Sequence, residues 1–465
     1  MIKFGTDGWR GIIARDFTFE NLQYVALATC NYLNKYSNPP HSAVIGYDTR
    51  FLSKEFAEEV ARVFAENGIK SYLANSIAST PQTSYNCKLY NASIGIMITA
   101  SHNPPQYNGY KLKANYGGPA SPELVSQVEK EIPEILATKP DINLQPLEHY
   151  INNGTIIYAD FKENYLNYLQ EKFDFEKIRK SGIHIVFDPM YGAGINTLGY
   201  LLPYIKEIHS TYNPSFAEIG HPEPIESMLG ELRGITSTGF DVGLASDGDA
   251  DRLGMVDEQG NFVDAHKIYM IILNYLYKFK NLRGKIVKTV SLSSMVDKYA
   301  KKYNIELVET PVGFKYSAEL MAKGGVLIGG EESGGLGTIL HIPERDGIFN
   351  GFLIIEEMIE RKMKLSELVN ELNEEFGNHI FKRIDVRMSE EEKARTLAMA
   401  SNSPKKLGNQ KVIEINNRDG FKFITDNGWL LVRASGTEPL VRFYAEADSK
   451  ERVEELLNAG LNFSK

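Results

Sequence analysis

The chain has 465 residues, of which 43% are hydrophobic and 24% charged, and its formal net charge is −9. The composition is that of a globular protein, and the length exceeds what one hydrophobic core usually serves, which predicts about three or four domains. The acidic balance argues against nucleic acid as a partner, and no apolar run approaches the ~18 residues of a membrane span.

Short apolar segments that end in turns alternate with helix-like stretches along most of the chain. Strands are predicted at 42–48, 94–99, 183–188, 240–245 and 286–290. Between the first two, residues 53–67 place apolar side chains at helical spacing and end at Asn67-Gly68, which is typical of a helix terminus. Strands that alternate with helices predict an α/β fold with parallel or mixed sheets.

The last part of the chain has a different pattern. From about residue 375, strands are predicted at 421–425, 428–433 and 441–445, followed by a helix at 450–461, which indicates an α+β unit. The polar, proline-containing stretch 138–146 is interpreted as a linker. We therefore expect four domains, at 1–140, 150–252, 253–370 and 375–465, the first three of them similar in size and indicative of an ancient repeat.

The chain holds two cysteines, Cys30 and Cys87, so neither a disulfide framework nor a cysteine-based metal site is expected. The first eight residues contain an acid and two glycines and do not resemble a signal peptide. A cytoplasmic protein is the expectation.

A serine follows the predicted strand at 94–99, in the sequence Thr99-Ala100-Ser101-His102-Asn103-Pro104. Pro104 blocks helix continuation and holds the serine at a turn. By itself it could be a turn serine without chemistry. Once phosphorylated, however, Ser101 would carry about −1.5 to −2 charges at neutral pH and would need a counter-cation.

Three aspartates at alternate positions can bind that cation. If the loop is extended, Asp247, Asp249 and Asp251 lie on one side of it, and with a phosphoryl oxygen they suit Mg²⁺. An EF-hand is the rival interpretation, since Glu258 is twelfth from Asp247, but the sixth position is Arg252 rather than glycine and a strand precedes the loop. Acids in a solvated loop remain the structural alternative. Together with Ser101, the motif predicts metal-assisted phosphoryl transfer through a phosphoserine.

Two further motifs suit a sugar phosphate. Residues 329–335, Gly-Gly-Glu-Glu-Ser-Gly-Gly, place two acids and a hydroxyl on a glycine-flanked loop, where they can accept hydrogen bonds from vicinal sugar hydroxyls. Residues 433–439, Arg-Ala-Ser-Gly-Thr-Glu-Pro, offer a guanidinium, two hydroxyls and a glycine amide to a phosphate. Each alone could be a solvated turn.

Nucleotide-binding signatures are missing from the sequence. Gly192-Ala193-Gly194 follows a strand, but Thr197 stands where a dinucleotide fingerprint needs its third glycine. No Gly-Lys-Ser/Thr phosphate loop occurs, so nothing indicates ATP. Of the nine histidines, only His102 and His341 lie beside a motif.

The four motifs, in this order and with the opening Phe-Gly-Thr-Asp-Gly-Trp-Arg-Gly of residues 4–11, resemble the α-D-phosphohexomutase superfamily, which includes phosphoglucomutases and phosphomannomutases. The resemblance extends from residue 4 to about 445. It implies a heart-shaped protein of four domains: three related, mixed-sheet α/β domains and a C-terminal α+β domain of the TATA-binding-protein-like type.

The resemblance also assigns the residues at which phosphate is transferred. It implies that Ser101 is the phosphoserine and that the three aspartates bind Mg²⁺ together with its phosphate. Arg10 and Lys111 resemble the cationic groups that flank the transferred phosphoryl group, and Arg252 would lie beside the metal. His102, the neighbour of the serine, is a further catalytic candidate.

A second set of residues would hold the sugar. Glu331 and Ser333 match the groups that read its hydroxyls, and Lys315, in Thr310-Pro311-Val312-Gly313-Phe314-Lys315, resembles a further substrate-facing position. The loop that holds the non-transferring phosphate would consist of Arg433, Ser435, Gly436 and Thr437.

One departure bears on the substrate. Phosphomannomutases and phosphoglucosamine mutases usually have histidine soon after the sugar-loop serine, where this chain has Gly335. His341 comes later and is a candidate acid/base group. The pair Glu331-Glu332 is closer to the phosphoglucomutase type and favours glucose over mannose.

The expected function is interconversion of hexose 1-phosphate and hexose 6-phosphate, with Mg²⁺ and a hexose 1,6-bisphosphate as intermediate and activator. Glucose phosphates are the preferred substrates, and mannose phosphates or dual specificity are the alternative. A non-catalytic sugar-phosphate-binding relative and a phosphoserine-forming phosphatase are the other hypotheses. The expected partner is a small hexose phosphate, with neither nucleic acid nor membrane, and the protein is expected to be a monomer or homodimer.

Overall fold

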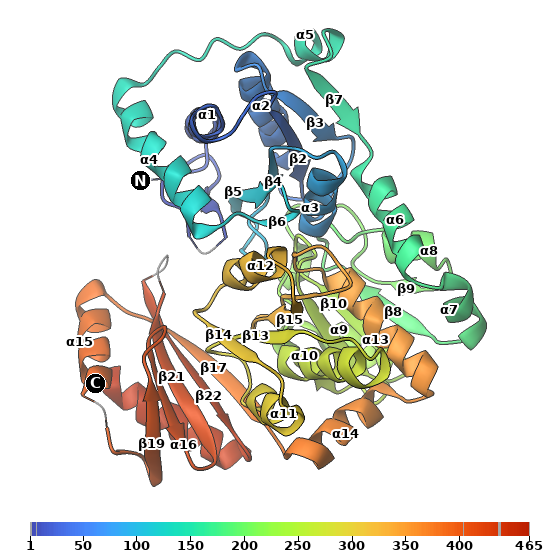
Figure 1. The fold of residues 1–465 in the computed structure, drawn as a ribbon, viewed down its shortest axis with the longest axis vertical. Coiled ribbons are helices and arrows are strands. Elements are labelled where there is room, and N and C mark those ends of the chain that lie inside the picture. Colours follow the sequence, from blue (N-terminus) through green and yellow to red (C-terminus); the bar gives the residue numbers. More distant parts are fainter. Residues whose placement is uncertain (1, 6, 403, 436–438, 465) are drawn as a thin grey trace.

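The computed structural model describes residues 2–5, 7–402, 404–435 and 439–464, and within these ranges the chain forms four β-sheets flanked by helices (Figure 1). The C-terminal sheet stands to one side of the other three, next to the third (Figure 1). Every helix in these ranges is too short or too polar to span a bilayer.

The first sheet is mixed and has the strand order β1-β5-β4-β2-β3-β7, with β6 paired to β5. Its strands are β1 (Trp9–Ile12), β2 (Ser42–Tyr47), β3 (Lys70–Ala74), β4 (Ile94–Ile98), β5 (Tyr107–Ala114), β6 (Gly118–Pro119) and β7 (Ile156–Ala159). Its helices are α1 (Phe19–Tyr36), α2 (Ser53–Glu66), α3 (Thr80–Leu89), α4 (Pro122–Thr138) and α5 (Leu147–Asn152).

The second and third sheets have the orders β12-β11-β10-β8-β9 and β14-β13-β15-β16. The second unit comprises α6 (Phe161–Lys172), α7 (Phe175–Ser181), β8 (Ile185–Asp188), α8 (Leu198–Leu201), β9 (Lys206–Glu207), α9 (Gly230–Thr236), β10 (Val242–Ser246), β11 (Leu253–Asp257) and β12 (Phe262–Val263). The third comprises α10 (Ala265–Asn274), β13 (Lys285–Thr289), α11 (Met295–Tyr303), β14 (Leu307–Thr310), α12 (Phe314–Ala322), β15 (Val326–Gly330), β16 (Leu336–Thr338), α13 (Gly347–Arg361) and α14 (Leu365–Phe376).

The C-terminal sheet is antiparallel, with the order β17-β22-β21-β20-β19-β18. Its core packs against α16 and includes Phe423, Leu430, Phe443 and Leu456. The unit comprises β17 (Ile380–Arg387), α15 (Glu390–Ser401), β18 (Lys406–Leu407), β19 (Gln410–Asn416), β20 (Phe421–Thr425), β21 (Gly428–Ala434), β22 (Leu440–Ala447) and α16 (Lys450–Leu461).

The first three units share one four-strand topology. In each, two adjacent strands pair in parallel with each other, as do β2 and β3, β8 and β9, and β13 and β14. The first strand of each pair also lies parallel to β4, β10 or β15, and that strand continues through a loop into the antiparallel β5, β11 or β16. The predicted relationship among the three α/β units therefore has a structural counterpart, strand for strand.

The first two sheets each extend further along the chain than the predicted domain limits. Strand β7 joins the edge of the first sheet, although the predicted second domain begins at residue 150. Strands β11 and β12 extend the second sheet beyond the predicted limit at residue 252. Both differences arise from pairing with strands of the preceding unit, which local composition does not encode.

Local sequence signals explain where several helices begin. The side chains of Thr18, Ser79, Ser121 and Asp346 each accept a hydrogen bond from a backbone N–H in the first turn of α1, α3, α4 and α13. Asp346 matters for the site described below, because it fixes the start of α13 directly after Arg345.

The second and third units share one hydrophobic core, which runs from Tyr165 in α6 to Phe376 in α14. The C-terminal unit contacts the third through a small separate cluster that includes Val290, Trp429, Leu431 and Tyr444. The fourth unit is thus attached to the third through this cluster and through hydrogen bonds such as that from Ser294 N to Glu446 Oε1.

Candidate active site

Three equivalent loops form the centre of the site, because each connects the two antiparallel strands named above. Ser101 lies between β4 and β5, the aspartates lie between β10 and β11, and Glu331 lies between β15 and β16. Backbone hydrogen bonds join the aspartate loop to the other units, from Thr80 N to Asp249 O (2.9 Å) and from Gly347 N to Ala250 O (3.1 Å). The site is therefore built where three units converge.

Ser101 is held in a left-handed conformation, with φ 54°, and it is 1% exposed. A non-glycine residue pays a conformational cost there, which the surroundings must offset. Ser101 N donates to Thr99 Oγ1 (2.9 Å), and Thr99 Oγ1 donates to Asp48 Oδ2 (2.6 Å). Ser101 Oγ donates to Asp247 Oδ2 (2.8 Å), so the hydroxyl points at the aspartate motif, as the sequence predicted.

The serine loop and the aspartate loop touch through backbone at Gly248. A Cβ atom at this position would lie 2.3 Å from Ser101 O, closer than any side chain tolerates. Glycine is required here because the two loops approach each other so closely.

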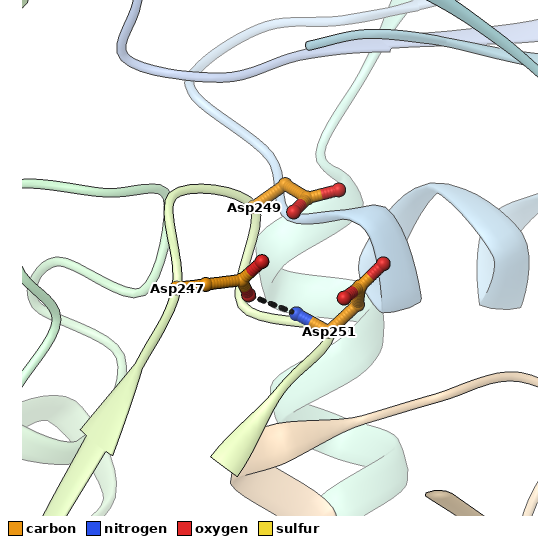
Figure 2. A group of neighbouring side chains, drawn as sticks. All are labelled: Asp247, Asp249 and Asp251. Carbon is orange, nitrogen blue, oxygen red and sulfur yellow. Dashed lines mark hydrogen bonds between the residues drawn. The ribbon is translucent and has the colours of Figure 1, made fainter. Parts of the chain in front are cut away.

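The three aspartates are fully buried, and one carboxylate oxygen of each lies within 4.8 Å of the others. Figure 2 shows the carboxylates directed toward one another. Two buried oxygens, Asp249 Oδ1 and Asp251 Oδ1, accept no hydrogen bond from any described residue. Buried, unpartnered carboxylate oxygens of this kind fit a hard divalent cation such as Mg²⁺, with Ser101 beside it.

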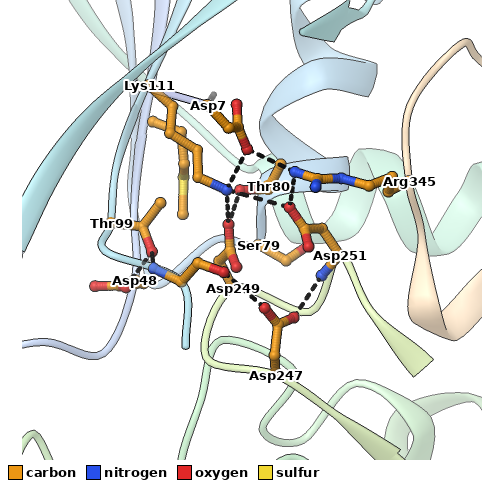
Figure 3. A network of polar contacts seen from close by, with 12 residues as sticks. Asp7, Asp48, Ser79, Thr80, Thr99, Lys111, Asp247, Asp249, Asp251 and Arg345 are labelled. Atoms are coloured by element: carbon orange, nitrogen blue, oxygen red, sulfur yellow. Dashed lines mark hydrogen bonds and ion pairs between the residues drawn. The ribbon is translucent and has the colours of Figure 1, made fainter. Parts of the chain in front are cut away.

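Two cations neutralise part of the aspartate charge (Figure 3). Lys111 Nζ lies 2.7 Å from Asp249 Oδ2, 3.1 Å from Asp251 Oδ2 and 2.9 Å from Asp7 Oδ2. Arg345 Nη2 lies 2.5 Å from both Asp251 Oδ2 and Asp7 Oδ2. Burial lowers the pKa of Lys111, but Asp249, Asp251 and Asp7 outweigh it and raise that pKa.

Asp247 and Asp249 differ in the direction of their pKa shifts. Burial, together with the charges of Asp249 and Asp251, raises the pKa of Asp247 well above its usual value. At Asp249, burial is outweighed by Lys111, which lowers the pKa. An added cation would favour the charged form of all three, so metal binding and deprotonation are linked.

Cationic side chains also lie beside the serine loop. Arg10 Nη1 donates to Asn103 Oδ1, and burial lowers the pKa of Arg10. Burial, with the charges of Arg252 and Arg10, lowers the pKa of His102 well below its usual value and keeps the imidazole neutral. Arg252 Nε lies 3.7 Å from Asp247 Oδ2, beside the aspartate loop as expected. An anionic phosphoryl group on Ser101 suits this field.

The predicted sugar loop reaches the same cluster. Glu331 Oε1 lies 2.9 Å from Arg345 Nη1, which joins this loop to the aspartates. Ser333 Oγ is buried and makes no hydrogen bond among the described residues, so its bonding capacity is available to a sugar hydroxyl. Burial lowers the pKa of Lys315, and the charge of Asp7, which belongs to the first unit, acts against that shift.

The predicted phosphate loop is described only in part. Arg433 lies near the end of β21 and is 9% exposed, and its Nε lies 2.8 Å from Asp419 Oδ2. Ser435 is also buried. Gly436 and Thr437 lie outside the described residues.

His341 does not fit the predicted acid/base role. Its side chain is 1% exposed, Nε2 lies 3.0 Å from Asp346 Oδ2, and Nδ1 accepts from Tyr168 OH at 2.8 Å. Its ring stacks on Phe349. Nδ1 is therefore hydrogen-bonded and the ring is packed at the start of α13, while Nε2 lies near Asp346 without a hydrogen bond among the described residues, so we propose a structural role in place of the predicted acid/base role.

Several residues of the site were not singled out from the sequence. Arg50 is 1% exposed and donates to the carbonyls of Ser101 (2.6 Å) and Pro104 (2.9 Å), which fixes the serine loop. Asp48 supports the same loop through Thr99. The signal was available, because both residues lie at or just after the end of the predicted strand at 42–48, where open α/β sheets place functional groups. Asp7 and Arg345 lie within sequence patterns, at 4–11 and 341–347, but their contact with each other links two units and could not be predicted from either pattern.

The chain matches the family models of all four phosphoglucomutase/phosphomannomutase domains, in order along the sequence. They are alpha/beta/alpha domain I over residues 1–139, domain II over 163–260, domain III over 264–376 and the C-terminal domain over 384–460.

Individual relatives match over almost the whole length. A probable phosphoglucosamine mutase of Pyrococcus furiosus is 33% identical, covering 98% of this chain and 95% of its own. A phosphoglucomutase/phosphomannomutase of Thermococcus kodakarensis is 31% identical, covering 98% and 97%. The crystal structure of a putative phosphomannomutase from Thermus thermophilus superimposes with a TM-score of 0.86 at 32% identity, covering 99% and 98%.

Proposed function

The chain belongs to the phosphoglucomutase/phosphomannomutase family and is a phosphohexomutase, and we propose that it interconverts hexose 1-phosphate and hexose 6-phosphate through a phosphoserine at Ser101. The observation that carries the proposal is the Ser101 hydroxyl, 2.8 Å from Asp247 in a loop held against the aspartate motif. The left-handed backbone of Ser101 (φ 54°) is compatible with this role, because it holds the hydroxyl toward Asp247.

In the proposed reaction, the phosphoryl group moves from Ser101 Oγ to the free hydroxyl of the hexose monophosphate. The product is a 1,6-bisphosphate and the unmodified serine. The sugar then turns end for end, and its other phosphoryl group passes to Ser101 Oγ, which releases the isomeric monophosphate. Serine and phosphoserine alternate, so no external phosphate donor is consumed per turnover.

Asp247, Asp249 and Asp251 would hold Mg²⁺, which when bound stabilises negative charge on the transferred group. Lys111 and Arg345 contact the aspartates, Arg10 contacts Asn103 of the serine loop, and these cations would stabilise negative charge on the transferred group. Arg50 and Asp48 hold the serine loop in place, so that the hydroxyl is positioned before substrate arrives.

Glu331, Ser333 and Lys315 would contact the sugar, and the Arg433 loop would bind the phosphate that is not transferred. An arginine fork suits a phosphate in either orientation of the sugar, because it recognises the phosphate and not the carbon that bears it. The loop Gly436-Thr437 would complete this contact.

The preferred sugar is the finer part of the proposal. The Glu331-Glu332 pair favours glucose phosphates, with mannose phosphates as the alternative. The relatives named above include phosphoglucosamine mutases, so glucosamine phosphates are a third substrate to compare.

The test is turnover with Mg²⁺ and a trace of bisphosphate on the 1-phosphates of glucose, mannose and glucosamine. Conversion of one of them to its 6-phosphate supports the proposal, and the ratio of kcat/KM values identifies the sugar. Release of inorganic phosphate in place of the isomer would favour a phosphatase. Binding without conversion of any of the three by phosphorylated protein would contradict the proposal and favour a regulatory relative.

A further inference from the structure

One face of the C-terminal sheet carries different side chains at the two ends of strands β21 and β22. Trp429 and Glu446 are paired in register at one end, and Arg433 and Arg442 at the other. At the first end, Glu446 Oε1 accepts from Trp429 Nε1 (3.0 Å) and from Ser294 N (2.9 Å), which attaches this unit to the third. The opposite end carries Arg433, the proposed phosphate ligand.

A second attachment to the third unit lies at the Arg433 end. One oxygen, Asp419 Oδ2, accepts hydrogen bonds from Arg433 Nε (2.8 Å) and from Val312 N (2.9 Å). Val312 belongs to the loop between β14 and α12, which leads directly to Lys315. A single carboxylate oxygen therefore joins the phosphate arginine of one unit to the substrate-facing loop of another.

The backbone keeps Asp419 in this position. Gly420 follows it with φ +86°, and a Cβ there would lie 2.4 Å from Val432 O and 3.1 Å from the Cα of Arg433. The turn before β20 consequently lies directly against β21, and only glycine permits that approach. The Asp419 and Arg433 side chains are 23% and 11% exposed, so the pair borders solvent.

We propose that Asp419 is a positioning residue that couples phosphate binding by Arg433 to the docking of the 310–315 loop. The proposal rests on the proposed function, since it requires Arg433 to bind the non-transferring phosphate. A hydrogen bond at Nε orients the guanidinium plane, which a bidentate phosphate contact needs. The hydrogen bond from Val312 N to Asp419 fixes the guanidinium relative to the 310–315 loop of the third unit.

The contact acts on orientation more than on stability. An ion pair at this exposure contributes little to folding, so loss of Asp419 should leave the fold unchanged. The loss should instead let Arg433 and the 310–315 loop move independently. The cost then falls on binding of a phosphorylated sugar and not on the chemistry at Ser101.

A matched control lies in the neighbouring strand. Asn416 Nδ2 donates to Glu309 Oε1 (2.6 Å), which also joins the C-terminal unit to the third unit but does not involve Arg433. Asn416→Ala removes one contact between the same two units. Any general loosening of this interface should affect both variants equally.

The experiment is a double-mutant cycle on the full-length protein with Asp419→Asn, Arg433→Ala and their combination, and Asn416→Ala as the control. Calorimetric titration with glucose 6-phosphate and with glucosamine 6-phosphate measures binding, and steady-state kinetics separate KM from kcat. We expect Asp419→Asn to weaken binding about 10-fold and to raise KM with little change in kcat. In the Arg433→Ala background the same substitution should have almost no effect, and Asn416→Ala should leave binding unchanged.

Four results would overturn the proposal, and they separate it from the proposed function. If Arg433→Ala weakens binding and Asp419→Asn does not, the coupling is absent while the phosphate role of Arg433 stands. If the two effects simply add, or if Asn416→Ala weakens binding as much, Asp419 acts only as an interface contact. If Arg433→Ala leaves binding unchanged, the proposed phosphate loop itself fails.

Discussion

The two ends of the proposed substrate site are built in opposite ways. Around Ser101, the groups are buried and held from several directions, and Lys111 and Arg345 link all three α/β units through carboxylates. Around Arg433, in the part of the chain that the structure describes, the partly exposed Asp419 carboxylate connects the arginine to the third unit.

The difference matches the tasks that we propose for each end. Phosphoryl transfer depends on fixed positions of nucleophile and charges, so a preassembled cluster favours it. A sugar that must turn end for end has to be released and bound again at its second phosphate. That end of the site benefits from a partly exposed contact, such as Asp419 with Arg433, that can adjust between the two bound states. The predictions below test this division.

The largest effect should come from the nucleophile. Ser101→Ala removes the hydroxyl that donates to Asp247 and should lower kcat by about 10⁴-fold or more. The fold should persist, because the side chain contributes little to the core, and circular dichroism checks this. Appreciable mutase turnover in a folded Ser101→Ala protein would contradict the phosphoserine mechanism.

The second-largest effect on turnover should come from disruption of the aspartate cluster. Asp249→Asn removes a negative charge from the proposed Mg²⁺ site and should raise the Mg²⁺ concentration for half-maximal turnover by about 100-fold. Chelation should abolish turnover of the unmodified protein, and added Mg²⁺ should restore it. An unchanged Mg²⁺ requirement in Asp249→Asn would place the metal elsewhere.

At the Arg433 end of the site, the effect of a substitution on turnover should be smaller and should fall mainly on KM. Arg433→Ala should lower kcat/KM, mainly by raising KM. The corresponding loss of transition-state stabilisation should be about 1.5–3 kcal/mol, the size of a hydrogen bond to a charged group. Steady-state kinetics with the preferred hexose 1-phosphate measure it. An unchanged kcat/KM would remove the loop from the site, and a loss confined to kcat would erase the contrast between the two ends.

The smallest effect on turnover should come from His341, which lies near the cluster but belongs to the packing of α13. His341→Phe should change kcat by roughly threefold at most, while loss of the buried hydrogen bond with Tyr168 should lower the free energy of unfolding by about 1–3 kcal/mol. Thermal unfolding and kcat measured on one preparation test both parts. A large loss of kcat without loss of stability would restore the acid/base role.

Much of this arrangement could be predicted from the sequence, because its signals are local. Each predicted strand is present, and the serine and aspartate motifs directly follow strands β4 and β10. The predicted cluster of aspartates is present, but the loop is a turn, with Ala250 at φ 58° and its N–H donating to Asp247 O (3.0 Å), and not the extended segment on which the prediction depended. The four-unit α/β and α+β architecture is confirmed by the sheets and by the matched domain descriptions.

What the sequence could not provide depends on contacts between units. His341 stood beside a motif, yet its position relative to Tyr168 in α6 follows from tertiary packing. The pairing of Arg345 with Asp7 spans 338 residues, and that of Asp419 with Val312 spans 107. Such pairs have no periodicity or spacing that a single sequence would reveal.

The most direct test of the central claim follows the phosphoryl group itself. Dephosphorylated protein is mixed with glucose 1,6-bisphosphate and Mg²⁺, and intact-mass and peptide mass spectrometry locate any added phosphoryl group, with Ser101→Ala as the control. We predict one phosphoryl group on Ser101, an equal amount of hexose monophosphate released, and no modification of the control. Modification of another residue, or mutase turnover by protein that never becomes phosphorylated, would contradict the account.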